Sequence, residues 1–150
     1  MKTLFLVLVA ALTLTSRADA QNSSVYQTQD GAIKGYDAVS YFTEGKAVKG
    51  SKDFQAKWNN ATWYFSSKKN KREFESHPEK YAPQYGGYCA YGTSQGHKAT
   101  TDPANAWTIV DGKLYLNYNQ DVMSSWRKDR NSLIPQADKN WPTVKDQPEP

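Results

Sequence analysis

The stretch KDFQAKWNNATWYFSSKKNKREFES, residues 52–76, decides the fold because it carries two strand signals, a turn signal and a helix signal in direct succession. Apolar side chains alternate along residues 52–58, and residues 62–65 are β-branched and aromatic. Both patterns are typical of strands. Asn59 and Asn60 lie between them, and asparagine tolerates the positive φ that tight turns demand. The stretch therefore predicts a β-hairpin.

A helix signal follows the hairpin. Ser66 or Ser67 can act as the N-cap, and the helix is expected to run to about Ser76. Pro78 ends it, because proline does not fit a helix interior. One further turn is expected at residues 79–81.

The second half of the chain repeats the pattern of hairpin and helix. Residues 107–110 and 113–118 predict strands joined by Asp111-Gly112, a strong hairpin signal. Asn119 is the expected N-cap of a last helix. Pro135 predicts a break in that helix near Asn131-Ser132, followed by a second short helix. The sequence thus predicts an α+β fold, a small antiparallel β-sheet with short helices packed on it.

The N-terminus has the pattern of a secretory signal peptide. Lys2 precedes an apolar run at residues 4–12, and Ala18-Asp19-Ala20 has the form of a cleavage site. The run is too short to span a bilayer, which needs about 20 apolar residues. Residues 1–20 are therefore expected to be removed on export, leaving a periplasmic or secreted protein without membrane insertion.

Polar, aperiodic segments flank the predicted domain. Residues 21–29 are interpreted as a flexible lead-in, and residues 143–150 as a flexible tail, because neither shows an apolar period. One domain is expected between them, over residues 30–142, since a chain of this length has room for a single core.

Composition narrows the function. The single cysteine excludes an internal disulfide, and the net charge of +4 comes from basic residues that alternate with acidic ones. Such a mixed surface does not predict nucleic-acid binding. No GxSxG, HExxH or phosphate-loop motif is present, so the sequence favours a non-enzymatic role. A thiol-dependent enzyme would rest on Cys89 together with His97 or His77.

Cys89 has three interpretations. It lies between two tyrosines and small residues, where a free cysteine is typically a buried core residue. Together with His97, in the polar loop that follows, it could instead bind a soft metal ion, because Cu(I) accepts two or three such ligands. The third interpretation is a reactive thiol.

The aromatic residues suggest another kind of site. Exposed rings on an exported domain can stack on sugars or hold a protein partner. Four tryptophans fall on strand or helix positions that a core would claim, namely Trp58, Trp63, Trp107 and Trp126. Trp141 and the segment 85–88 are the aromatic positions expected to be accessible.

Several separated motifs resemble the YHS-domain family, in its exported bacterial branch. They are Gly35-Tyr36-Asp37-Ala38-Val39-Ser40-Tyr41-Phe42, Trp63 to Ser67, Phe74, His77 to Tyr81, Gly86 to Ala90, Asp102-Pro103, Trp107 to Asn119 and Asp138 to Pro142. The resemblance covers residues 30–142 with the motifs in order.

The resemblance implies metal handling, particularly of copper, with a metal ion or a metal-handling protein as partner. Metal-binding relatives would have cysteines near residues 38–39 and 66–67, and this chain has none there. A copper site is thus expected at Cys89 and His97, with Tyr36, Asp37 and Tyr88 as further ligand-binding residues. Asp37 is equally suited to be a helix N-cap. The open alternative is a ligand- or protein-binding module without metal, in which Cys89 is a core residue.

Overall fold

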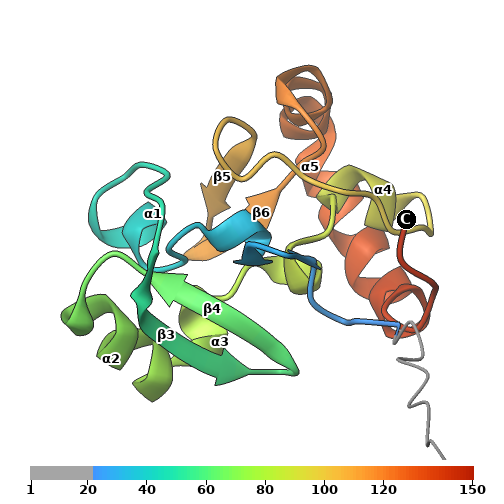
Figure 1. Ribbon diagram of the computed structural model, residues 1–150. Coiled ribbons are helices and arrows are strands. Elements are labelled where there is room, and N and C mark those ends of the chain that lie inside the picture. Colours follow the sequence, from blue (N-terminus) through green and yellow to red (C-terminus); the bar gives the residue numbers. More distant parts are fainter. Residues whose placement is uncertain (1–21) are drawn as a thin grey trace, which may run out of the picture.

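A computed structural model describes residues 22–150 (Figure 1), so the predicted signal peptide at residues 1–20 lies outside the described residues. The elements in chain order are β1 (Gln27–Thr28), β2 (Gly31–Ala32), η1 (Ile33–Gly35), α1 (Ser40–Thr43), β3 (Ser51–Trp58), β4 (Ala61–Phe65), α2 (Lys68–Ser76), α3 (Pro78–Tyr81), η2 (Gln84–Gly87), α4 (Ala90–Ser94), β5 (Trp107–Val110), β6 (Lys113–Leu116) and α5 (Gln120–Val144). The strands form three separate two-stranded antiparallel sheets. The predicted α+β class is confirmed, with three small hairpins in place of one sheet.

The β3–β4 hairpin forms where the sequence predicts it. Asn59 and Asn60 make the turn at φ values of 51° and 58°, and Trp58 pairs with Ala61 beyond them. The register shifts between Ser51 and Gln55, which marks a bulge in β3. The turn therefore sets the position of Trp58 at the tip of the hairpin.

Helix α2 begins at the predicted cap. The Ser67 hydroxyl accepts a hydrogen bond from the Asn70 N–H at 3.1 Å. Pro78 then starts α3, where its missing N–H costs nothing because first-turn donors have no helical partner.

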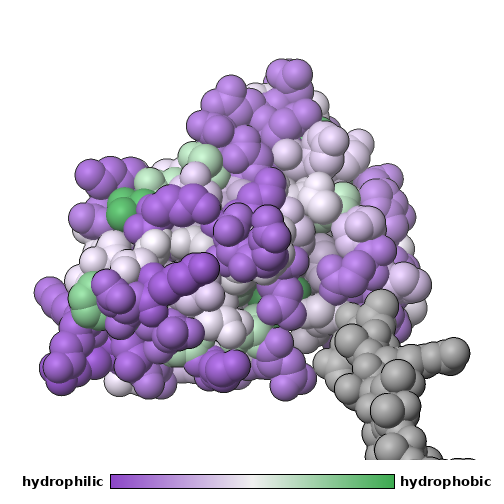
Figure 2. All heavy atoms as spheres, viewed as in Figure 1, coloured by the Kyte–Doolittle hydropathy of each residue, from purple (hydrophilic) through white to green (hydrophobic). Residues whose placement is uncertain are grey.

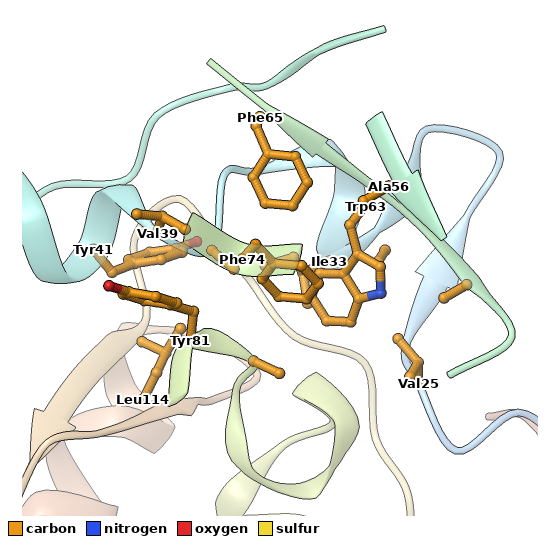
Figure 3. Close-up of a cluster of buried hydrophobic side chains, with 14 of the residues drawn as sticks. Val25, Ile33, Val39, Tyr41, Ala56, Trp63, Phe65, Phe74, Tyr81 and Leu114 are labelled. Atoms are coloured by element: carbon orange, nitrogen blue, oxygen red, sulfur yellow. The ribbon is translucent and has the colours of Figure 1, made fainter. Parts of the chain in front are cut away.

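Phe74 of α2 joins the helix to the hairpin. Its ring centroid lies 5.0 Å from those of both Trp63 and Phe65 and 5.8 Å from that of Trp58. Phe74 is fully buried, and Figure 3 shows its ring at the centre of this core. The cluster packs against the Trp58 ring and holds it in place.

A second core cluster lies under α5. The β5–β6 hairpin turns at Asp111 and Gly112, as predicted, with φ values of 51° and 73°. Its strand β6 places Tyr115 against Trp126 of α5, with ring centroids 5.1 Å apart. The cluster consists of Tyr85, Ala90, Tyr115, Trp126, Leu133 and Ala137.

Helix α5 differs from the prediction of a break near Asn131-Ser132. Asn119 caps it as expected, but the helix is continuous for 25 residues through Pro135 and Pro142. An interior proline costs about 3 kcal/mol and leaves the carbonyl four residues earlier without its partner. Both prolines face solvent, and the residues that lose these bonds are exposed. Water can satisfy their carbonyls while the opposite face stays packed.

The segment 21–29, predicted to be a flexible lead-in, is packed against the domain in its described residues. Val25 is fully buried, Tyr26 is 5% exposed, and the Tyr26 N–H donates to the Gly86 carbonyl at 2.8 Å. The backbones approach so closely that a Cβ on Gly86 would collide with the Ser24 carbonyl oxygen. Val25 and Tyr26 are two apolar residues in a polar segment, too few to show a periodic pattern. Their contact with Gly86 could therefore not be predicted from the local sequence.

The predicted tail at residues 143–150 also contacts the domain. Val144 is 1% exposed. Lys98, itself 6% exposed, donates from Nζ to the carbonyls of Ser23 at 2.8 Å and Gln147 at 2.7 Å. Figure 1 shows the first described residues beside the C-terminal end. One lysine thus joins the two ends of the described chain.

Hydrophilic residues cover most of the face shown in Figure 2. Within residues 22–150, no helix combines the length and the apolar character needed to cross a membrane.

Candidate ligand-binding cleft

Cys89 is a buried residue at the start of α4. Its side chain is 2% exposed, and its Sγ lies 3.5 Å from the Asn117 Oδ1 that accepts its hydrogen bond. Burial raises the pKa of the thiol, although backbone N–H groups around the sulfur act in the opposite direction. The thiol is therefore neutral at physiological pH.

The residues around this thiol do not fit a metal ion. Metals bind the thiolate, which burial disfavours here. The unpartnered buried atom nearby, Asn117 Nδ2, is a hydrogen-bond donor and cannot coordinate a cation. His97 is exposed, and its Nδ1 lies 3.2 Å from the Lys98 carbonyl oxygen. Among residues 22–150, no three His, Cys, Asp or Glu side chains are grouped so that they could hold a metal.

Chemical access to Cys89 is expected only when the protein unfolds. Thiol reagents and Cu(I) should react with the native protein slowly, at the rate of its opening, and with denatured protein at once. The Cys89→Ala variant should lose about 1–2 kcal/mol of stability through lost packing. Labelling by mass spectrometry and chelator competition for Cu(I) measure these effects. If the native protein bound Cu(I) stoichiometrically and Cys89→Ala abolished this binding, the assignment of a copper site to Cys89 would be supported.

Asp37 is fully buried, and its carboxylate is saturated by donors of the chain. Oδ1 accepts the N–H groups of Val39 at 2.9 Å and Ser40 at 3.3 Å. Oδ2 accepts the Ser66 N–H at 2.8 Å, the Ser66 hydroxyl at 2.7 Å and the Asn70 Nδ2 at 2.8 Å. These bonds fix the turn that precedes α1 and join it to the start of α2. Asp37 has a structural role.

Tyr36 and Tyr88 also make contacts within the chain. The half-buried Tyr36 ring lies 4.7 Å from the Lys49 Nζ. Tyr88 is fully buried and Tyr85 is buried as well, so the expectation that the aromatic rings of segment 85–88 would be accessible is wrong. Its hydroxyl lies 2.9 Å from both the Ser23 carbonyl oxygen and the Glu149 Oε1. Burial, followed by the Glu149 contacts, raises the pKa of this hydroxyl.

A hollow of about 550 Å³ lies between the hairpin tip, η2 and the last turns of α5. Trp58, Trp63, Tyr85 and Trp141 supply its aromatic surface, and Asn59, Glu79, Gln84, Asp138 and Lys145 its polar side chains; Ser24, Ala82, Pro83 and Gly86 complete it. We call this hollow the aromatic cleft. Its volume is within the usual range for small-molecule sites, as is its combination of aromatic rings with a few polar groups.

Tyr85 lies at the base of the aromatic cleft in a strained conformation. Its φ is 57°, and Gly86 and Gly87 continue the left-handed run at 61° and 85°. A side chain in this region costs about 1–3 kcal/mol unless the surroundings hold it. The Tyr85 hydroxyl is held 2.8 Å from the Asp138 Oδ1, and its ring centroid lies 6.0 Å from that of Trp141. Strain of this kind clusters at functional sites.

Electrostatics make Tyr85 a fixed donor. Burial, followed by the hydrogen bond to Asp138, raises the pKa of its hydroxyl, which stays neutral. Asp138 is thereby oriented toward the aromatic cleft from α5. Trp58 and Trp141 are half-buried, so each ring is held in place while part of it stays accessible.

Comparison with known proteins finds a family match over part of the chain that lines this cleft. A model of the YHS domain family matches residues 39–85. The chain contains a YHS domain. The search of curated proteins and the search of solved structures each found no match. The YHS match extends from the residue before α1 into η2, whereas the wider resemblance over residues 30–142 stays a prediction.

The YHS domain forms one wall of the aromatic cleft and α5 forms the other. Trp58, Trp63, Glu79 and Tyr85 lie within the matched residues, and Asp138, Trp141 and Lys145 lie outside them. The structure does not bring the predicted residues Tyr36, Asp37, Tyr88, Cys89 and His97 into this cleft.

The sequence correctly predicted that Trp141 is accessible, but it placed Trp58 in the core, and Trp58 is half-buried in the cleft. The alternating pattern of β3 gave Trp58 an inward face, but beside the turn at the tip of the hairpin its side chain is only half-buried. The only local signal for the cleft was Tyr85-Gly86-Gly87, because paired glycines indicate unusual backbone.

Proposed function

We propose that this chain is a non-catalytic module that binds a carbohydrate in the aromatic cleft and acts outside the cell. The observation that carries the proposal is the pair of half-buried indoles, Trp58 and Trp141, in one hollow with amide and carboxylate side chains. A pyranose ring has an apolar C–H face that stacks on an aromatic ring and a rim of hydroxyls that hydrogen-bond to such groups. Location outside the cell rests on the pattern of residues 1–20 alone.

A carbohydrate fits the lining better than an organic cation does. Cages for quaternary ammonium ions surround the charge with open ring faces. Here Trp63 is 1% exposed and Tyr85 is 5% exposed, so two of the four rings offer little open face. Lys145 stands among the charged lining residues together with Glu79 and Asp138, so the acidic side chains of the lining are partly offset by a basic one. The neutral, hydroxyl-rich ligand is therefore favoured.

Copper handling, which the family resemblance implies, receives no support from the donors around Cys89. It stays a prediction, and Cu(I) competition on native protein tests it independently of carbohydrate binding.

Carbohydrate binding is expected to depend on the two accessible indoles. Trp141→Ala and Trp58→Ala should each weaken binding by at least tenfold, because a stacked aromatic residue at the centre of a site is worth about 2 kcal/mol. Tryptophan fluorescence and calorimetry with a panel of monosaccharides and oligosaccharides measure the affinity.

Tyr118→Ala is the matched control, because Tyr118 is 54% exposed and lies outside the aromatic cleft. It should bind as the parent does. The ligand should be recovered unchanged after incubation, and released product would contradict the non-catalytic role. The proposal fails if no saccharide binds, or if Trp141→Ala binds like the parent.

A further inference from the structure

The aromatic cleft is not isolated. A second hollow of about 410 Å³ is lined by Asn22, Ser23, Ser24, Gln27, Asn60 and Glu149. Ser24 lines both hollows. A third, of about 530 Å³, follows the hairpin tip and shares Trp58 and Asn59 with the aromatic cleft and Asn60 with the second hollow. The three hollows thus surround the tip of the β3–β4 hairpin as neighbours.

The second hollow has a different chemistry from the aromatic cleft. All its lining residues are polar, and they offer hydroxyl, amide and carboxylate groups without an aromatic ring. The side chains of Ser24 and Asn60 make no hydrogen bond within residues 22–150, whereas the Glu149 Oε1 accepts the Ser23 backbone N–H at 3.1 Å. Free hydroxyl and amide groups beside a stacking surface suit the next sugar ring of a chain.

The boundary between the two hollows is rigid. The Gly86 backbone presses on Ser24, and the adjacent Tyr26 N–H donates to the Gly86 carbonyl at 2.8 Å. On the other side, the turn fixes Asn60 at a φ of 58°. A ligand that crosses this boundary therefore meets groups already in position, which lowers the entropy lost on binding.

Charge along the groove selects against acidic ligands. Glu79 and Asp138 line the aromatic cleft and Glu149 lines the second hollow, with Lys145 as the basic side chain of these two sites. Like charges brought together in a partly desolvated groove cost free energy. A uronic acid chain would place its carboxylates beside these groups.

We propose that the aromatic cleft and the second hollow form one groove that binds a linear oligosaccharide of uncharged sugars, with one ring stacked in the cleft and the following rings bonded at Ser24 and Asn60. This inference rests on the proposed carbohydrate function. It adds the length of the ligand, its charge and two specificity residues.

Affinity should rise with chain length. Calorimetry of the native protein with a series of neutral oligosaccharides should show about tenfold tighter binding for three or four rings than for one, since one or two extra hydrogen bonds are worth about 1.4 kcal/mol in all. Acidic oligosaccharides of the same length should bind at least tenfold more weakly.

Two variants locate the added contacts. Asn60→Gly removes the amide but keeps the turn, because Asn-Gly is the preferred pair for a two-residue hairpin. Ser24→Ala removes the hydroxyl. Each should weaken binding of the long ligand, and the two together should remove about the tenfold gain that the added contacts give. Asn60→Gly should leave the affinity for a single sugar unchanged, because Asn60 lies outside the aromatic cleft, whereas Trp141→Ala weakens the binding of both ligands.

The outcomes separate the two proposals. If no saccharide of any length binds, the proposed function fails and this inference with it. If short and long ligands bind equally, or if Asn60→Gly and Ser24→Ala leave the long ligand unaffected, the extended groove is wrong and the aromatic cleft stands alone. Equal binding of acidic chains overturns the charge selection.

Discussion

Raising the pH above 10 is expected to unfold this protein within a few pH units. Tyr41, Tyr85 and Tyr88 are each at most 5% exposed, and burial raises the pKa of all three hydroxyls well above the usual value of 10.0. The unfolded chain loses these protons near pH 10 while the native state keeps them. A raised native pKa gives stability that is complete below the unfolded value and lost as the pH rises beyond it.

The size of this effect follows from the number of protons. Each one lowers the free energy of unfolding by about 1.4 kcal/mol per pH unit, so three give roughly 4 kcal/mol per unit. A domain of this kind has a free energy of unfolding of about 5–15 kcal/mol, which this slope removes within a few pH units. Cys89 acts in the same direction from about pH 9.0, while burial lowers the pKa of Lys98, which opposes it by one proton up to about pH 10.5.

Urea unfolding at successive pH values measures the slope, and tyrosinate absorbance follows the ionisation. Tyr41→Phe should reduce the slope by one proton, although it also removes the 2.7 Å hydrogen bond to the Pro103 carbonyl. Tyr118→Phe is the matched control, because it removes a hydroxyl from a side chain that is 54% exposed. Constant stability between pH 10 and about 12 would show that these hydroxyls ionise as readily in the native state.

Replacing Asp37 by alanine should destabilise the fold by about 3–5 kcal/mol. The substitution leaves up to five hydrogen bonds unmade, and an unsatisfied buried donor costs about 1–3 kcal/mol before water enters the space. Among residues 22–150 the carboxylate has no lysine or arginine partner in an ion pair. Its donors therefore carry the full stabilisation of the buried charge.

Two comparisons identify the cause. Asp37→Asn keeps the shape but turns one acceptor into a donor that faces the Ser66 and Asn70 donors, so much of the loss should remain. Asp53→Ala removes an exposed aspartate and should change stability by less than about 0.5 kcal/mol. Chemical denaturation measures all three variants. A loss below 1 kcal/mol for Asp37→Ala would mean that water replaces the carboxylate at little cost.

The local elements could be predicted from the sequence because their signals lie within a few residues. Asn59-Asn60 and Asp111-Gly112 have the backbone freedom of hairpin turns, and both hairpins form there. Ser67 and Asn119 accept the capping bonds expected of them, at 3.1 and 2.8 Å. In each case the residues that predict the turn or the helix start are the same residues that form it.

The aromatic cleft could not be predicted in this way, because its walls come from separate parts of the chain. Trp58 and Trp141 are 83 positions apart in the sequence, and they meet only because α5 continues past Pro135. A local rule for proline predicted a break there, while tertiary packing of Leu133 and Ala137 kept the helix intact. The left-handed conformation of Tyr85 likewise depends on the distant Asp138.

The contacts of Lys98 with Ser23 and Gln147 have a consequence for the order of folding. The two bonds span 75 and 49 positions and together link Ser23 to Gln147, so a chain synthesised from its N-terminus can close this part of the structure only after Gln147 has emerged. Contacts of such sequence separation slow the folding of a small domain. The contacts of Lys98 with Ser23 and Gln147 are therefore expected to form after the local hairpins and helices.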